Sequence, residues 1–330
     1  MINNLLHQMF MRPAQSLLSK LNVLVTGGAG FIGSHLCREL LKEGAYITVL
    51  DDLSTGKLSN LTPEIKFILG SVNDGPLLEE LIKDTNVIFH LAAIASVPKC
   101  EENPQLNTLV NFESTSTILN IAKKYKNVKS FVFTSSAAVY GAPKKIPITE
   151  DHDILPLSLY GGAKAKSEEL LMNDNSLPTC CLRLFNIYGK GQESSSPYSG
   201  VLSIFVRNII TEQNISIFGD GKQTRDFTHV YDAVKAFIGV SKNLLESGTD
   251  SKCNNKSFNV CTEKGVDLNQ IIKIFESITK KNLTVHYFPA RGNDITHSIG
   301  NFTRINSAIG WIPEINLKDG LKMLINNDDF

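Results

Sequence analysis

A tyrosine and a lysine stand four residues apart in the stretch LYGGAKAKSEEL, residues 159–170. On one turn of a helix, Tyr160 and Lys164 would share a face, with Cβ atoms roughly 5–6 Å apart. A free tyrosine has a pKa near ~10 and is a poor base at neutral pH, but nearby positive charge favours its phenolate. Lowering that pKa by ~3 units takes about 4 kcal/mol of preferential interaction with the charged form. The pair therefore predicts a site where a tyrosine takes up and returns a proton.

A serine precedes this pair at the end of the apolar stretch SFVFTSS, residues 130–136. The stretch predicts a buried strand, and α/β sheets bind ligands at the carboxyl ends of their strands. Ser136 would then lie beside the reacting hydroxyl and hydrogen-bond to it. A Tyr-x-x-x-Lys pair alone is equally typical of a solvated helix face, so it is the serine that favours a catalytic trio of Ser136, Tyr160 and Lys164. His90, also at a strand end, is expected to be packed and hydrogen-bonded rather than catalytic.

Three glycines mark a second site, at the start of the chain's regular structure. TGGAGFIG places Gly27, Gly30 and Gly33 directly after a predicted strand and before a predicted helix. Glycines at this spacing allow a tight turn, close approach of the backbone to a pyrophosphate, and close packing of helix on strand. The helix N-terminus would face the phosphates with its N–H groups. Asp51, about twenty residues on, can bind both ribose hydroxyls and would repel a 2′-phosphate, which favours NAD over NADP.

Alternating elements must position these residues. The strand-like runs, apolar on both faces, are 22–27, 45–52, 65–70, 86–93 and 130–136. The helical stretches among them are 31–42, 76–83 and 104–125. Strands that alternate with helices and are buried on both sides predict an α/β fold of Rossmann type, with a doubly wound parallel sheet.

The second half is less regular and predicts a smaller α/β substrate-binding lobe. Its helical patterns are 201–212, 230–246, 267–279 and 316–326, and 215–227 is typical of a strand, a glycine turn and a second strand. We expect an N-terminal extension over 1–20, an NAD-binding domain over 21–186 and the lobe over 187–330. Part of the lobe is expected to return to the sheet near 258–261.

Composition excludes several classes of protein. The 330 residues carry 33 basic and 33 acidic side chains, so no charge excess indicates nucleic acid as a partner. No apolar run is long enough for a membrane span, and residues 1–20 do not have the pattern of a signal peptide. Six scattered cysteines lack the spacing of a metal site and are expected to be reduced core thiols, as in a cytoplasmic protein.

Seven motifs in order carry a family resemblance: TGGAGFIGSHL, VLDDLSTG, HLAAIASV, TSSAAVYG, YGGAK, LRLFNIYG and GDGKQTRDFTHVYDAV. Over residues 21–315 the chain resembles the extended short-chain dehydrogenase/reductases, in particular the NAD-dependent nucleotide-sugar 4-epimerases. The resemblance implies bound NAD, a UDP-sugar substrate, and Ser136, Tyr160 and Lys164 as catalytic residues. It also implies a homodimer joined by two helices of each subunit, 104–125 and the one carrying Tyr160.

The resemblance assigns further residues to each ligand. Those implied for the cofactor, besides Tyr160 and Lys164, are Gly27, Gly30, Phe31, Ile32, Gly33, Asp51, Asp52, Ser71, Val72, Leu91, Ala92, Ala93 and Asn111. Those implied for the substrate, besides Ser136, are Ser96, Asn186, Val201, Phe218, Arg225, Arg291, Asp294 and Ser298. Asn186, Arg225 and Arg291 would contact the diphosphate. Two departures weaken single contacts: Ser71 stands where relatives often have an adenine-binding Asp, and Ala163 replaces a serine.

The reaction follows from what the site lacks. Related dehydratases carry an Asp–Glu pair, and related decarboxylases a Glu, where this chain has Ala137 and Ala138. Without a carboxylate there, β-elimination has no evident acid or base. We expect Tyr160 to take the proton of the sugar 4-hydroxyl while the C4 hydride passes to NAD⁺, and the 4-keto sugar to be reduced on its other face. A non-enzymatic NAD-binding regulator is disfavoured because the catalytic trio is intact.

One residue bears on the identity of the sugar. At the position of Ser298, epimerases limited to UDP-glucose and UDP-galactose tend to have tyrosine, whereas relatives that accept N-acetylhexosamines have a small residue. An acetamido group at C2 of the sugar needs the space that the ring of this tyrosine would occupy. With ASVP at 95–98, this favours UDP-N-acetylglucosamine 4-epimerisation. UDP-glucose 4-epimerisation and action on a UDP-N-acetylhexosaminuronic acid remain the alternatives.

Overall fold

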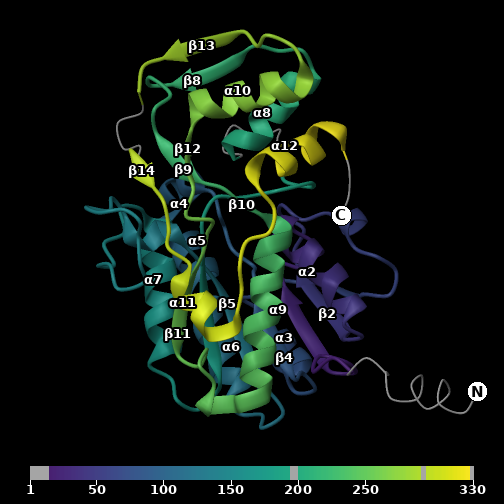
Figure 1. Ribbon diagram of the computed structural model, residues 1–330. Helices are drawn as coiled ribbons and strands as arrows, with labels where there is room; N and C mark the ends of the chain where they lie inside the picture. The colour runs from purple at the N-terminus through teal and green to yellow at the C-terminus, as the bar shows by residue number, and fades with distance from the viewer. Residues whose placement is uncertain (1–14, 194–199, 291–294, 328–330) are drawn as a thin grey trace, which may run out of the picture.

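A seven-stranded parallel sheet forms the centre of the computed structural model, which describes residues 15–193, 200–290 and 295–327 (Figure 1). Its strands are β1 (Asn22–Thr26), β2 (Tyr46–Asp51), β3 (Lys66–Leu69), β4 (Val87–His90), β5 (Ser130–Ser136), β6 (Thr179–Leu184) and β11 (Lys256–Val260). They run in the order β11-β6-β5-β4-β1-β2-β3, and every neighbouring pair is parallel. The order reverses between β1 and β4, which is where doubly wound sheets bind their ligands.

Helices cover both faces of the sheet. One face packs against α2 (Phe31–Lys42), α9 (Val230–Ser247) and α11 (Thr303–Ile309), and the other against α3 (Gly75–Ile82), α6 (Ser114–Ala122) and α7 (Leu159–Met172). Successive strand residues alternate between the two cores: Val23 and Val25 belong to the first and Leu24 to the second. The expected Rossmann-type α/β fold is therefore confirmed.

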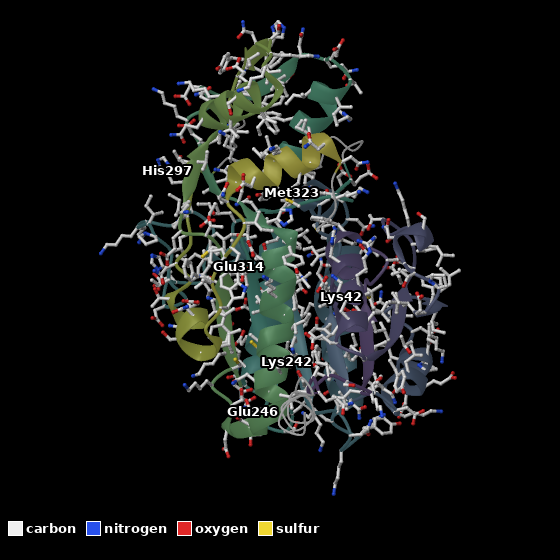
Figure 2. The ribbon with its side chains drawn as sticks, turned by 45° about the vertical axis from the view of Figure 1, so that its right-hand side comes forward. Lys42, Lys242, Glu246, His297, Glu314 and Met323 are labelled. Atoms are coloured by element: carbon white, nitrogen blue, oxygen red, sulfur yellow. The ribbon has the colours of Figure 1, made fainter. Side chains whose placement is uncertain are left out.

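Charged side chains keep the outer side of the first helical layer polar. Figure 2 shows Lys42 near the end of α2 and Lys242 and Glu246 along α9. Lys242 forms an ion pair with Glu43 at 2.8 Å, which joins the two helices at the surface. Such a partly exposed surface pair contributes ~0–1 kcal/mol, so the apolar residues beneath it hold these helices on the sheet.

A smaller lobe sits above the carboxyl ends of the strands (Figure 1). Its helices are α8 (Val201–Ile210), α10 (Leu268–Thr279) and α12 (Leu317–Asn326). Its strands form three small sheets: β8 (Ile215–Phe218) with β13 (Val285–Phe288), β7 (Ile187–Tyr188) with β10 (Thr228–His229), and β9 (Thr224–Asp226) between β12 (Gly265–Asp267) and β14 (His297–Ser298). The two strands expected within 215–227 are present as β8 and β9, but they belong to different sheets.

Two features of the chain path go beyond the sequence pattern. The segment expected as one helix over 104–125 consists of α5 (Pro104–Thr108), a π-helical turn η2 (Leu109–Glu113) and α6. A further short helix, α4 (Val97–Glu102), precedes it, and 3-10 turns span Leu58–Asn60, Ala137–Tyr140 (η3) and Gly248–Asp250. Single π-turns often mark functional sites, and η2 carries Asn111. The strand β11 returns the chain to the sheet edge beside β6.

The expectations about cysteines, membrane helices and metal sites can be compared with the described residues. All six cysteines are buried and free. None of the helices in the described parts of the chain combines the length and apolar character needed to cross a bilayer. Over the same residues, no group of three or more His, Cys, Asp or Glu side chains is placed to hold a metal ion. The domain limits at 20 and 186 stay a prediction.

Candidate active site

The glycine turn between β1 and α2 leaves no room for side chains. Gly27 has φ +70°, and a Cβ there would lie 2.6 Å from the backbone N of Ala92, across the sheet's switch point. A Cβ on Gly33 would lie 2.2 Å from the carbonyl O of Gly27. At Gly30, no side chain of the described residues caps α2, so the N–H groups of its first turn can face an anion. The turn therefore fits a pyrophosphate at a helix N-terminus.

Asp51 joins this turn to the end of β2. Its carboxylate accepts hydrogen bonds from the backbone N–H groups of Ala29, at 3.0 Å, and Leu53, at 2.9 Å. Burial raises the pKa of Asp51, and these two donors oppose that rise. Each carboxylate oxygen has a second lone pair, so Asp51 can also accept from two ribose hydroxyls. Together with the glycine turn, the residues present fit NAD.

The loop after β4 lies against the glycine turn, where Leu91 and Ala92 contact Gly27. Ala92 donates its N–H to the hydroxyl of Thr26, at 3.3 Å, which fixes the first residues of the loop. The side chain of Asn111 holds Ile94 in the same loop by two hydrogen bonds. Its Oδ1 accepts from the N–H of Ile94 at 2.9 Å, and its Nδ2 donates to the Ile94 carbonyl at 3.1 Å. The π-turn η2 presents Asn111 at this position, so it supports the loop that contains Leu91, Ala92 and Ala93.

Ser71, Val72 and Asp52 are the residues expected at the adenosine end of the cofactor. The hydroxyl of Ser71 accepts from the N–H of Asn73 at 3.2 Å, and Val72 is buried. The carboxylate of Asp52 accepts from the N–H of Ser54 at 2.9 Å, so it shapes the loop after β2. The contacts of these residues with NAD stay predictions.

The three expected catalytic residues lie together. Lys164, 1% exposed, donates from Nζ to the carbonyl of Thr134 at 2.8 Å, and Nζ lies 5.9 Å from the centre of the Tyr160 ring. The hydroxyl of Ser136 accepts from the N–H of Ala138 at 3.1 Å and lies near enough to Tyr160 to lower the pKa of its phenol. Ser158 caps α7 by accepting from Gly161, so the helix that carries Tyr160 and Lys164 begins at a fixed point.

Burial dominates the electrostatics of the trio. Burial raises the pKa of Tyr160 to about 12, against the hydrogen bond from Ser136, which lowers it. Burial also lowers the pKa of Lys164 to about 7, so this lysine is only partly charged at neutral pH. Lys164 therefore does not by itself activate the phenol. Desolvation outweighs the hydrogen bond, and activation needs further positive charge at the site.

The residues expected to bind the substrate come from separate segments of the lobe. Ser298 on β14 is the register partner of Arg225 on β9, so these two are direct neighbours. Asn186, with φ +33°, donates from Nδ2 to the carbonyl of Asp226 at 3.0 Å, next in sequence to Arg225. Phe218 lies apart on β8, 38% exposed.

Four other residues complete the expected set. Ser96 caps the N-terminus of α4, and Val201 is the first residue of α8. Arg291 and Asp294 lie outside the described residues. The structure thus brings Asn186, Arg225 and Ser298 close together through β9, and their contacts with a substrate stay predictions.

His90 has the structural role expected of it. Its Nδ1 lies 2.7 Å from the hydroxyl of Thr26, and its Nε2 lies 3.1 Å from that of Thr115. Burial lowers the pKa of His90 to about 3. The neutral ring bridges β1, β4 and α6 beneath the site.

Three buried charged residues behind the site, Arg183, Glu168 and Asp226, were not identified from the sequence. Arg183 on β6 forms an ion pair with Glu168 on α7 at 2.6 Å. Asp226 accepts hydrogen bonds from Thr262, Glu263 and Gly300, and so joins β9 to the segments that follow β11 and β14. The sequence held one signal, a single charged residue within the apolar strand CCLRLF, residues 180–185.

Comparison with known proteins agrees with this geometry. Residues 23–261 match the model of the NAD dependent epimerase/dehydratase family. The UDP-glucose 4-epimerase of Lactobacillus helveticus is 32% identical over 306 residues, which are 89% of this chain and 92% of that protein. The structure of Thermotoga maritima UDP-glucose 4-epimerase with UDP-glucose is 34% identical, covers 93% of this chain and 98% of its own, and has a TM-score of 0.86.

A further solved structure has a different sugar specificity. The UDP-N-acetylglucosamine 4-epimerase of Methanobrevibacter ruminantium, in complex with UDP-N-acetylmuramic acid, is 32% identical, with a TM-score of 0.86. The alignment covers 93% of this chain and 98% of that one. Family model, relatives and site geometry agree, and the chain belongs to the NAD-dependent epimerase/dehydratase family, as an NAD-dependent nucleotide-sugar epimerase of the extended short-chain dehydrogenase/reductases.

Proposed function

We propose that this chain interconverts UDP-N-acetylglucosamine and UDP-N-acetylgalactosamine. The observation that carries the proposal is the placement of Ser298 directly beside Arg225 in the paired strands β14 and β9. Arg225 is the residue expected to bind the diphosphate, and its planar fork suits paired hydrogen bonds to phosphate. A serine beside this arginine would leave space for an acetamido group at C2 of the sugar, which a tyrosine would fill.

The side chains of the trio divide the chemistry between them. Tyr160, as phenolate, accepts the proton of the sugar 4-hydroxyl, and Ser136 hydrogen-bonds at the same place. NAD, held by the glycine turn and Asp51, would supply positive charge to the site and the reversible oxidation at C4 of the sugar. The 4-keto sugar turns about its diphosphate, held by Asn186 and Arg225, and presents its other face. Tyr160 then returns the proton.

The alternatives differ in the sugar or in the reaction. UDP-glucose 4-epimerisation is supported by the names of two relatives above, and a UDP-N-acetylhexosaminuronic acid differs only at C6. A dehydratase or decarboxylase is opposed by η3, whose residues Ala137 and Ala138 offer no carboxylate beside Tyr160. Free thiols at all six cysteines support a cytoplasmic site of action.

A direct assay tests the proposal. The purified protein, without added NAD, is incubated with UDP-N-acetylglucosamine and separately with UDP-glucose, and the sugars are followed by NMR. We expect the acetylated pair to reach equilibrium, and the denatured protein to release NAD. Conversion of UDP-glucose alone would refute the proposed substrate. Consumption of NAD in proportion to product would refute epimerisation.

Substitution of Ser298 separates the sugars. In a Ser298→Tyr variant the phenol fills the space beside Arg225, so we expect turnover of the acetylated sugars to fall by about a hundredfold, a cost of ~2.7 kcal/mol. Turnover of UDP-glucose should change less than about threefold. Initial rates for both sugars, measured by NMR, check this. Ser277→Tyr on the exposed side of α10 is the control, and an equal loss on both sugars would contradict the role of Ser298.

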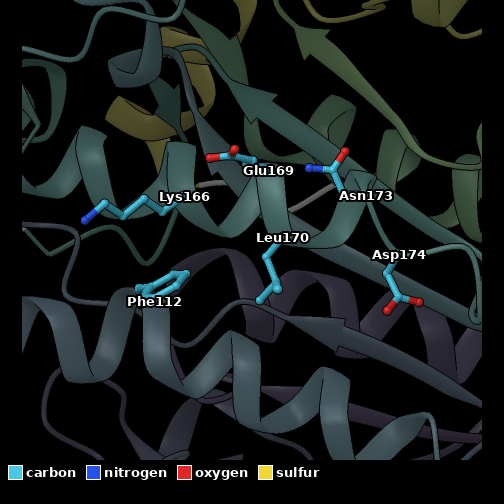
Figure 3. A pocket seen from close by; sticks show the side chains of 6 residues that line it. All are labelled: Phe112, Lys166, Glu169, Leu170, Asn173 and Asp174. Carbon is cyan, nitrogen blue, oxygen red and sulfur yellow. The ribbon is translucent and has the colours of Figure 1, made fainter.

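We also propose that the chain forms a homodimer through α7 and the segment α5–η2–α6. Figure 3 shows the groove between them, with Phe112 from η2 and Leu170 from α7 at its apolar centre. Two further apolar side chains of this segment, Leu106 on α5 and Leu109 on η2, are 42% and 39% exposed. A second copy of this surface could bury the more than ~1,000 Å² that a stable interface needs.

A charge placed in the groove tests the dimer. In a Leu170→Glu variant two carboxylates would be buried near the two-fold axis, so we expect a monomer by light scattering at concentrations where the wild type is dimeric. Ile312→Glu, at an exposed apolar residue far from α7 in sequence, should leave the dimer intact. A wild-type monomer, or a dimeric Leu170→Glu variant, would contradict this interface.

A further inference from the structure

The strongest polar contact behind the site is between Glu168 and Arg183. The Nε of Arg183 donates to both carboxylate oxygens of Glu168 at 3.0 Å, and its Nη2 lies 2.6 Å from Oε2. Their side chains are 2% and 4% exposed. A paired guanidinium–carboxylate contact of this kind fixes orientation as well as distance.

This pair connects the elements that carry the catalytic trio. Glu168 lies one turn after Lys164 on the buried face of α7, and Arg183 is the register partner of Ser135 in the sheet. The Nη1 of Arg183 donates at 2.8 Å to the hydroxyl of Tyr140, the last residue of η3, which begins directly after Ser136. The pair therefore sets α7 against the strand end that presents Ser136.

The network continues into the next strand. The hydroxyl of Tyr140 donates to Oδ1 of Asn259 on β11 at 2.6 Å, and that of Ser257 donates to Oε2 of Glu168 at 3.1 Å. Each strong acceptor and donor here has a partner, so the whole unit is held in one arrangement. Stability alone does not account for it, because apolar residues of similar volume often serve at least as well as a buried ion pair.

The pair also affects the charge of Lys164. The groups that face this lysine are His90 from β4, Cys100 from α4, Cys181 from β6, and Tyr160 and Glu168 from α7 itself. Burial lowers the pKa of Lys164. This decrease is opposed by three neighbouring groups, Cys181, Glu168 and Cys100.

Only one of the three groups that raise the pKa of Lys164, the carboxylate of Glu168, is charged at neutral pH. Burial raises the pKa of both thiols, so Cys100 and Cys181 stay neutral. Among the described residues that face Lys164, Glu168 is therefore the anion near it.

We propose that the Glu168–Arg183 pair is a positioning unit of the epimerase: it holds α7 against Ser136 and places a carboxylate one helical turn from Lys164, where its negative charge favours the ammonium form of the lysine. Neither residue contacts the substrate. Arg183 holds the Glu168 carboxylate, and Lys164 donates to the Thr134 carbonyl. This inference rests on the epimerase reaction proposed above.

Removal of the charge on Glu168 tests the proposal. In Glu168→Gln, loaded with NAD, we expect kcat to fall by about tenfold with KM within about twofold, because positioning acts in the transition state. The pKa of Lys164, measured by NMR on lysine labelled with ¹³C at Cε and assigned with Lys164→Arg, should fall by about half a unit or more. Glu79→Gln, which breaks an exposed ion pair with Lys124, is the control and should change neither.

A double variant guards against loss of folding. Glu168→Gln with Arg183→Met removes both charges, so no guanidinium is left buried without a partner. It should fold and retain NAD, yet keep the low kcat and the lowered pKa of Lys164. Wild-type values of both in the folded double variant would overturn the proposal. A wild type that converts neither sugar would instead refute the proposed function, and the titration of Lys164 would still decide the role of the pair.

Discussion

A Tyr160→Phe variant that folds and retains NAD is expected to convert the UDP-sugar about 10³ times more slowly than the wild type, within the usual range for a lost general base. The phenylalanine ring keeps the packing above Lys164, whose Nζ lies 5.9 Å from the ring centre. What it removes is the oxygen whose pKa Ser136 lowers and which, in our proposal, exchanges a proton with the sugar. Initial rates by NMR, with NAD content measured on the same sample, check the expectation.

The matched control for this variant is Tyr46→Phe. Tyr46 begins β2, at the opposite end of the strand from Asp51, and is 61% exposed, so the loss of its hydroxyl should leave the rate unchanged. Tyr160→Phe at an undiminished rate, with NAD bound, would contradict the proposed chemistry altogether. A variant that is slow only because it lost NAD would be identified by the NAD content and is a different result.

The raised pKa of the phenol makes this variant informative. Burial raises the pKa of Tyr160 to about 12, whereas a base at neutral pH needs a pKa near ~7. A difference of ~5 units corresponds to about 7 kcal/mol of preferential stabilisation of the phenolate, more than one partly charged lysine supplies. We therefore expect the charge of Lys164, the effect of Ser136 and the positive charge that NAD⁺ would supply to act together, and the charge state of Lys164 to affect the rate.

Local signals predicted the cofactor half of the fold. The glycine turn, the strand ending at Asp51 and the helix 31–42 are each specified by a few neighbouring residues, and the structure has them as β1, β2 and α2. Apolar runs buried on both faces also indicate a parallel sheet without knowledge of the strand order. The fold class could therefore be predicted from the sequence alone.

Contacts between distant segments were not predictable in the same way. Arg183 is conspicuous in an apolar strand, but nothing near it in the sequence indicates Glu168, Tyr140 or Asn259 as partners. The π-turn η2 has no local signal either, because it depends on the fit of Asn111 around Ile94. Likewise β8 and β9, adjacent in sequence, pair with β13 and with β12 and β14, which come much later.

The second large effect is expected at the glycine turn. In Gly33→Ala the new Cβ would lie 2.2 Å from the carbonyl O of Gly27 and 2.7 Å from the Cα of Gly28. Both are backbone atoms and cannot move aside as a flexible side chain would, so the turn must open. We expect a cost of about 1–3 kcal/mol in stability, typical of overpacking, and loss of most of the bound NAD.

Thermal unfolding and the NAD released on denaturation measure both effects. Gly75→Ala at the start of α3 is the control, because its Cβ would meet no atom within 4 Å, so Tm and NAD content should stay near the wild type. The turn places the N-terminus of α2, with its N–H groups, against the switch point between β1 and β4. If Gly33→Ala kept a full complement of NAD, the pyrophosphate would not depend on this turn, and the cofactor would have to be held mainly by Asp51 and the loop that Asn111 supports.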